Sequence, residues 1–355
     1  MKLFHRSLII FGWLAAFTIA LYLPHFEIFP FQEKSINLFT WGDTIDLNVL
    51  SEFEKKTGIK VNISYYSTNE ELLIKMKATG GDDYDLIMPS DYAVKRLIKE
   101  ELVQKIDRRR LNFWHDINPA LLKHSFDPKN TYSIPFEWEI YGMGVNAKFF
   151  KDKPFQPSWN AVFNTDQIDY TIAMNNDPIE VVLFAAFYLY NKTRSITPEE
   201  FAGVRKLLLE QRKKVEAYSD TRADYFIATG NCPVALSVSA LIKRVRLLFP
   251  EVDFVVPEEG TFITIENLCL PKASKKQKYV YQLLNFLYTK ESMIKHYDSF
   301  WFFPATLSPI NDLDLDPYEK KLLQMTREEF NKFHFIQNIY PQQKVRDLWV
   351  EVKSF

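Results

Sequence analysis

The sequence predicts an α/β fold made of two lobes, and three observations lead to this prediction. First, residues 36–99 alternate strand-like and helix-like segments in the order β-α-β-α-β, which is typical of a largely parallel sheet flanked by helices. Second, the 355 residues exceed the length of one typical domain. Third, no repeat, low-complexity segment or long linker divides the chain, which favours lobes joined by crossing strands.

Three runs of β-branched, aromatic and other apolar residues predict the strands of the first unit, at residues 36–40, 59–66 and 84–89. Ligands of parallel sheets bind at the carboxyl ends of the strands, beside helix N-termini. We therefore expect ligand contacts at residues 41–43, 65–69 and 90–92.

Two helices are predicted between these strands. The first spans about 46–56, with apolar residues at helical spacing, and Gly58 is placed to end it. The second opens with the capping-box pattern of Thr68 and Glu71 and ends near residues 80–81.

A second unit begins after about residue 140. Asp177 and Pro178 open an apolar helix that runs to about Tyr190, and Pro198 stands at the first turn of a helix predicted over 197–215. Further strands are predicted at residues 170–174, 232–238, 252–256 and 263–270.

Charge and composition exclude several functions. Lys and Arg total 44 against 45 Asp and Glu, so no general basic field favours nucleic acid. Ten glycines leave little material for phosphate-cradling loops. The motif at 142–147 fits G-x-G-x-x-A but lacks the acidic residue about 20 positions on that a dinucleotide needs. The six histidines are scattered, so we expect no metal site and no cofactor.

The N-terminal residues 1–34 are typical of an export segment. Lys2 and Arg6 precede an uncharged apolar run of 16 residues from Leu8 to Leu23, which Pro24 ends. This length lies between a signal-peptide core and a membrane span of roughly 20 residues. The segment is therefore either a cleaved signal peptide or an uncleaved membrane anchor, and in both cases the rest of the chain is exported.

Cys232 and Cys269 are the only cysteines, and they lie far apart outside any C-x-x-C motif. In an oxidising compartment they can pair, and in apolar segments they can remain as buried free thiols. The sequence leaves both alternatives open.

Several stretches together resemble the spermidine/putrescine-binding proteins of bacterial ABC importers, which are extracellular solute-binding proteins. The resemblance covers nearly all of the exported part and is densest from 36 to 146. The matching stretches are residues 37–43, 53–61, 84–92, 126–136, 142–146, 256–260 and 284–287.

This resemblance implies a type II periplasmic binding protein fold, with two lobes that are each a mixed sheet flanked by helices and with a ligand cleft between them. One lobe would hold residues 36–139 and 262–311, and the other residues 140–261 and 312–355. The implied function is the binding component of a polyamine importer. In the periplasm it would close over its ligand and deliver it to an inner-membrane permease.

A polyamine site needs carboxylates at ammonium spacing, because burying an unpaired cation costs several kcal/mol. The resemblance assigns amine contacts to Asp177, Glu180 and Glu266. Each has a structural alternative. Asp177 and Glu180 flank Pro178 in a capping-box pattern, and Glu266 lies in an alternating strand where an acid can simply face solvent.

Polyamine sites also need flat aromatic walls, which cover methylenes and attract each cation by ~0.5–2 kcal/mol. Trp41 and Tyr92 match wall positions of the family, and Ser90 matches a nearby polar contact. Asp43 falls at a turn beside the cleft, and Gln337 is similar to a glutamine that contacts ligand. Ordinary core packing is the alternative role for the aromatic residues. Further aromatic candidates are Trp138, Trp301 and Phe303, and Asp91 is a further acidic one.

The chain also departs from the family pattern. Thr44, Ser237 and Thr264 occupy positions where the family carries aromatic residues. Glu137 and Glu139 are acids that the family pattern does not usually carry. We therefore expect a cation-selective site reshaped for another amine.

Other functions compete with polyamine transport. One is a binding protein for a different solute, such as another amine or a thiamine-like cation. A second is a transferase on the same fold with Cys232 or Cys269 as nucleophile, although neither lies beside an obvious base. A third is a membrane-tethered sensor. We expect a binding protein without catalytic residues.

Overall fold

The computed structural model describes residues 11–14, 17–18, 34–219 and 223–354. The predicted export segment therefore lies almost wholly outside the described residues. Residues 11–14 and 17–18 are helical and exposed. Within the ranges described, no helix is both long and apolar enough to cross a bilayer.

The first sheet is parallel and has the strand order β2-β1-β3. Its strands are β1 (Ser35–Trp41), β2 (Lys60–Tyr66) and β3 (Leu86–Ile87). The helices that follow them are α2 (Leu47–Thr57), α3 (Asn69–Thr79) and α4 (Asp91–Lys99). The parallel sheet predicted for residues 36–99 is thus confirmed.

Local capping explains why α2 is predictable. Asp46 accepts a hydrogen bond from the backbone N–H of Asn48 at 2.7 Å, and Gly58 ends the helix in the left-handed conformation at φ 67°. Buried Val49, Leu50 and Phe53 form the face that packs on the core.

The second sheet has eight strands, with the path β11-β9-β4-β7-β5-β6 and with β8 and β10 paired to β4. The longest strand is β4 (Ile134–Asn146), which pairs antiparallel with β9 (Phe262–Leu268). The others are β5 (Ile172–Met174), β6 (Val215–Tyr218), β7 (Val234–Val238), β8 (Val252–Val255), β10 (Phe303–Pro304) and β11 (His334–Phe335).

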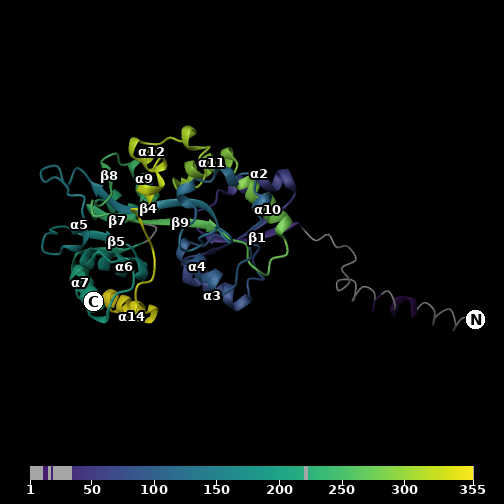
Figure 1. The fold of residues 1–355 in the computed structure, drawn as a ribbon, viewed down its shortest axis with the longest axis horizontal. Helices are drawn as coiled ribbons and strands as arrows, with labels where there is room; N and C mark the ends of the chain where they lie inside the picture. The colour runs from purple at the N-terminus through teal and green to yellow at the C-terminus, as the bar shows by residue number, and fades with distance from the viewer. Residues whose placement is uncertain (1–10, 15–16, 19–33, 220–222, 355) are drawn as a thin grey trace, which may run out of the picture.

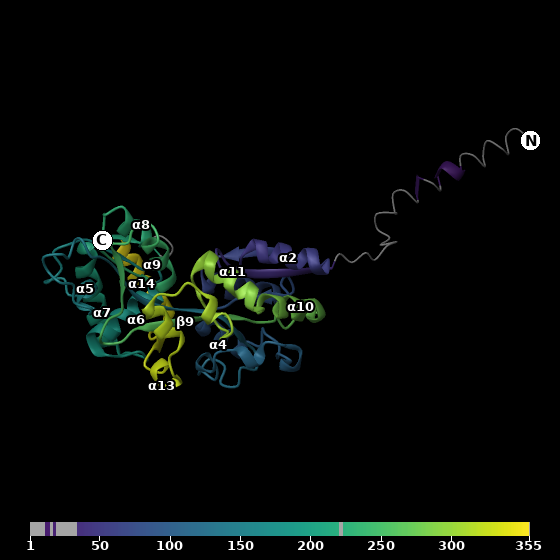
Figure 2. The same cartoon turned by 90° about the horizontal axis from the view of Figure 1, so that it is seen from above.

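The remaining helices cover both sheets. In the second half they are α5 (Asn160–Phe163), α6 (Pro178–Tyr190), α7 (Pro198–Gln211), α8 (Ala223–Ala228) and α9 (Ser239–Arg246). Towards the C-terminus follow α10 (Gln277–Leu287), α11 (Lys290–Phe300), α12 (Pro317–Leu323), α13 (Arg327–Phe330) and α14 (Gln342–Ser354). Helix α2 lies beside α10 and α11 (Figure 2).

Buried apolar residues divide the molecule into two lobes, with β4 and β9 running between them (Figure 1). The core of the first lobe draws on residues 36–140 and 263–330. The core of the second draws on residues 141–262 and 336–352, with a smaller cluster beside it that includes Ile242 and Val252. The two-lobed α/β fold is thus confirmed.

The lobe boundaries predicted from the family, with a last crossing at 311/312, stay a prediction. Leu313, Leu322 and Phe330 pack in the core of the first lobe, whereas Ile336 packs in that of the second. We therefore propose that the last crossing lies between Phe330 and Ile336.

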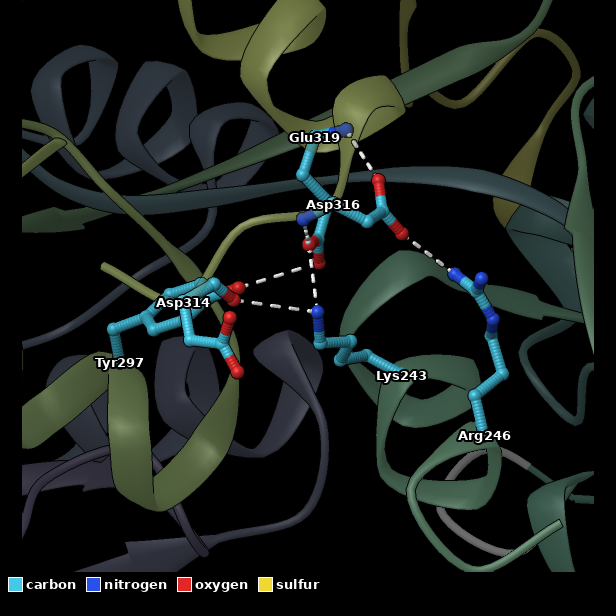
Figure 3. A network of polar contacts seen from close by, with 6 residues as sticks. All are labelled: Lys243, Arg246, Tyr297, Asp314, Asp316 and Glu319. Carbon is cyan, nitrogen blue, oxygen red and sulfur yellow. Dashed lines mark hydrogen bonds and ion pairs between the residues drawn. The ribbon is translucent and has the colours of Figure 1, made fainter. Parts of the chain in front are cut away.

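A polar network joins α9 to α11 and α12 (Figure 3). Lys243 pairs with Glu319 at 2.7 Å, and Arg246 pairs with Asp316 at 2.7 Å. Tyr297 donates to Glu319 at 3.2 Å. Since α9 packs in the second lobe and α11 and α12 in the first, this network links the lobes.

Candidate functional site

The carboxylate of Glu266 on β9 gathers groups from the ends of β1 and β3. It accepts a hydrogen bond from Trp41 Nε1 at 2.9 Å and from Ser90 Oγ at 2.5 Å. Asn69 Nδ2 in turn donates to Ser90 Oγ at 3.0 Å. Ser90 and Glu266 also form an antiparallel β-bridge, which fixes β9 beside the first sheet.

Glu266 is therefore not the solvent-facing strand acid that the sequence left as an alternative. It is 9% exposed. Burial raises its pKa from 4.5 to about 8, against the lowering effect of the hydrogen bonds from Ser90 and Trp41. A buried carboxyl of this kind favours a positively charged partner.

Asp177 and Glu180 at the start of α6 have different roles. Asp177 Oδ1 accepts from the N–H groups of Ile179 at 2.7 Å and Glu180 at 3.2 Å, so it caps the helix. The Glu180 carboxylate does not turn back to complete a capping box. It accepts instead from Tyr141 Oη at 2.5 Å and from Asn175 Nδ2 at 2.9 Å.

Tyr92 on α4 connects the two groups of acids. Its ring packs against the core of the second lobe. Burial raises the pKa of its phenol, and the nearby carboxylates of Asp177, Glu70 and Glu180 raise this pKa further. Tyr92 Oη donates to Glu70 at 3.4 Å. Acidic side chains from both lobes therefore surround one aromatic ring.

Trp41 and Tyr66 form the aromatic side of this site. Their ring centroids lie 4.5 Å apart with planes tilted by 53°. Tyr66 is buried, and Glu266 and Tyr92 are among the neighbours that raise its pKa. No group of three or more His, Cys, Asp or Glu side chains that could hold a metal occurs in the part of the chain described.

The other predicted residues lie elsewhere. Asp43 is exposed in the turn after β1, in the left-handed region at φ 55°, which aspartate tolerates better than most residues. Gln337 donates to the backbone carbonyl of Thr193. Trp138 and Phe303 are buried and pack on each other with centroids 4.8 Å apart, which fits core packing.

The positions expected to differ from the family are buried and polar. Thr44 Oγ1 bonds within its own turn, to Trp41 O at 3.0 Å. Ser237 and Thr264 are 2% and 7% exposed. The hydroxyl of Ser237 has no hydrogen-bond partner among the described residues, whereas Thr264 interacts with the phenol of Tyr141.

Glu137 and Glu139 lie two residues apart on the same face of β4, and they differ in their partners. Glu137 bonds to His296 inside the first lobe. Burial raises the pKa of Glu137 and lowers that of His296 to about 3, so the pair is a neutral hydrogen bond. Glu139 carries a buried Oε2 without a partner.

Several site residues were missed by the sequence reasoning. Tyr141 and Asn175 hold Glu180, and Gln342 of α14 donates to Glu70 at 3.0 Å across the lobes. Glu70 and Asn69 fall within the strand-end region 65–69 or beside it, which was the available signal. Nothing in the pattern around Gln342 singled it out.

Both cysteines are free thiols and buried. Burial raises the pKa of Cys232 to about 11 and that of Cys269 well above its usual value. A thiol held in its protonated form is a poor nucleophile, so the geometry disfavours cysteine catalysis.

Several known proteins are similar to this chain in sequence or in fold. The spermidine/putrescine-binding periplasmic protein of Escherichia coli (strain K12) is 30% identical over 258 residues, covering 72% of this chain and 73% of its own. The putrescine-binding periplasmic protein of Pseudomonas aeruginosa (strain UCBPP-PA14) is 29% identical over 280 residues, covering 74% and 76%.

A solved structure of a putative spermidine/putrescine ABC transporter from Listeria monocytogenes superposes with a TM-score of 0.80 at 24% identity. It covers 90% of this chain and 99% of its own. A sequence profile for bacterial extracellular solute-binding proteins matches residues 48–319. With this profile, the relatives and the two-lobed fold in agreement, the chain belongs to the bacterial extracellular solute-binding proteins.

Proposed function

We propose that this protein is the polyamine-binding component of an ABC importer, as the names of its relatives suggest. It binds an organic cation of the putrescine and spermidine class between its lobes, closes over it and delivers it to an inner-membrane permease. It acts as a receptor and not as an enzyme.

One observation carries this proposal: carboxylates from both lobes converge on Tyr92 and Trp41. Asp177 and Glu180 approach Tyr92 from α6, and Glu266 is bound to Trp41. Within the described ranges, no lysine or arginine forms an ion pair with Glu266. An ammonium ion would supply the missing positive charge. The indole ring of Trp41 and the phenol ring of Tyr92 would cover the methylenes of the ligand.

The location follows from the same proposal. We place the two lobes in the periplasm, in keeping with the relatives' names. Residues 1–34 serve either as a cleaved signal or as a tether to the inner membrane. N-terminal sequencing of the protein from its native membrane distinguishes these two: a chain beginning at Met1 indicates a tether.

Calorimetry tests the function directly. The full-length chain in a mild non-ionic detergent is titrated with putrescine, cadaverine, spermidine, spermine, thiamine, neutral amino acids and sulfate. We expect heat only from the diamines and polyamines. Binding of a neutral or anionic solute without any amine would overturn the proposal.

A further inference from the structure

Glu139 lies between the two groups of acids that the proposed function uses. On β9, Thr264 is its direct cross-strand partner and Glu266 lies two residues farther on the same face. On β4, Tyr141 follows two residues later and holds Glu180. Glu139 therefore lies between Glu266 on the paired strand and the Tyr141 phenol that binds Glu180 of α6.

Unpartnered polar atoms mark this middle position. Glu139 Oε2 is buried without a hydrogen bond. Asn175, which is 6% exposed, also leaves its Oδ1 unpaired beside Glu180. Buried polar atoms normally have partners, so these two acceptors indicate a donor that the ligand brings.

The charge balance agrees. No lysine or arginine in the residues described pairs with Glu139. Burial raises its pKa well above the usual range, and the neighbouring Glu137 and Glu266 raise it further. Glu137 is bound to His296 through Oε2 and leaves Oε1 unpaired, and Glu139 likewise leaves its buried Oε2 unpaired.

We propose that Glu139 is a specificity-determining residue that binds the internal secondary ammonium of a linear triamine, so that the protein selects triamines over diamines of equal length. The inference rests on the proposed function, in which Glu266 and the pair Asp177 and Glu180 take the terminal ammonium groups. A diamine would leave Glu139 facing methylenes, and burying such an unpaired polar group weakens binding.

Two ligands isolate this effect: spermidine and 1,8-diaminooctane. The second has a methylene in place of the internal NH, with the terminal nitrogens the same number of atoms apart. In the full-length protein we expect spermidine to bind at least about tenfold more tightly, as a charge-assisted hydrogen bond would give. In Glu139→Gln the two affinities should converge, chiefly through weaker spermidine binding.

Controls separate binding from folding. Glu328→Gln removes an exposed acid from α13 and should keep the preference. Glu139→Asp keeps the charge and should retain part of the preference for spermidine. Calorimetry in buffers of different ionisation enthalpy counts protons, and spermidine should release more protons from the unaltered protein than from Glu139→Gln. A merely structural residue would not change that count.

The outcomes are distinct. Equal affinity of the unaltered protein for both ligands overturns the inference and leaves the proposed function intact, whether or not the variants fold. A preference that survives Glu139→Gln also overturns it. Failure of every amine to bind overturns the proposed function, and the inference falls with it.

Discussion

Trp41 donates its indole N–H to the carboxylate of Glu266 at 2.9 Å, although the two residues are 225 positions apart in the chain. Trp41 ends the first strand of one sheet, and Glu266 lies on the strand that crosses between the lobes. The contact therefore positions the Glu266 carboxylate in the site and also holds β9 beside the first sheet.

Replacing Glu266 should weaken cation binding without unfolding the protein. Glu266→Gln keeps the shape and can still accept from Trp41 and Ser90, but it loses the charge. Charge-assisted hydrogen bonds contribute about 1.5–3 kcal/mol, so putrescine or spermidine affinity should fall roughly ten- to a hundredfold. Calorimetry measures the affinity, and a change of less than twofold would contradict a role in binding.

Asp177 allows capping and binding to be separated. Asn is as good a helix N-cap as Asp, so Asp177→Asn should preserve stability while weakening polyamine binding. Asp177→Ala should weaken polyamine binding and should also lower the free energy of unfolding by about 1 kcal/mol. Urea denaturation and calorimetry on the two variants make the comparison. If Asp177→Asn bound polyamines as tightly as the unaltered protein, Asp177 would act only as a helix cap.

Binding should strengthen between about pH 6 and pH 8. The folded pKa of Glu266, about 8, lies above the ordinary 4.5, so the ligand-free protein holds a proton that the unfolded chain releases. Its stability without ligand should therefore fall as pH rises from about 4.5 to 8. A cation competes with that proton, and its affinity should rise between about pH 6 and pH 8 by up to about tenfold per pH unit for this group. Glu266→Gln should remove this group's share from both profiles and leave that of other buried carboxyls such as Glu139, whose pKa burial also raises. An affinity that falls with pH would be inconsistent with proton displacement.

Trp41 should report ligand binding by its fluorescence. Because its N–H is bound to Glu266, a cation arriving at that carboxylate changes the surroundings of the indole. We expect a ligand-dependent emission change that disappears in Trp41→Phe and remains in Trp349→Phe, a partly exposed tryptophan of α14. An unchanged signal in Trp41→Phe would place the ligand elsewhere.

The link between the lobes should contribute to stability. Lys243 and Glu319 are 13% and 9% exposed, so Lys243→Met leaves a buried carboxylate without its cation. Breaking a buried pair costs about 3–5 kcal/mol. Lys320→Met, an exposed lysine of the same helix as Glu319, should change the unfolding free energy by less than about 0.5 kcal/mol. Equal effects of the two in urea denaturation would show that the pair adds nothing.

Sequence reasoning predicted best where the causes are local. Helix α2 was placed to within a residue because Asp46 and Gly58 cap it through neighbouring atoms. The helix predicted over 197–215 instead ends at Gln211, since Val215 pairs with Ile172 in the second sheet. That pairing depends on a distant strand, which no local pattern contains.

The candidate site, too, was predictable only where its causes are local. Carboxylates and aromatic residues at strand ends pointed to the right regions, but the roles of Glu266 and Glu180 came from family resemblance and not from spacing. The contacts of Tyr141 with Glu180 and of Gln342 with Glu70 depend on how two lobes pack. The role of each aromatic residue was ambiguous from the sequence for the same reason: Trp41 and Tyr92 lie near the acids, whereas Trp138, Trp159 and Phe303 fill cores.

The crossing of β4 and β9 also sets an order of events during biogenesis. Tyr141 on β4 pairs with Val238, and Glu139 on the same strand pairs with Thr264, which is synthesised far later. The pairing of β4 with β9 cannot form until nearly three quarters of the chain exists. Because such non-local pairing folds slowly, the nascent chain stays open for longer, and an open chain is the form that can be threaded through an export channel.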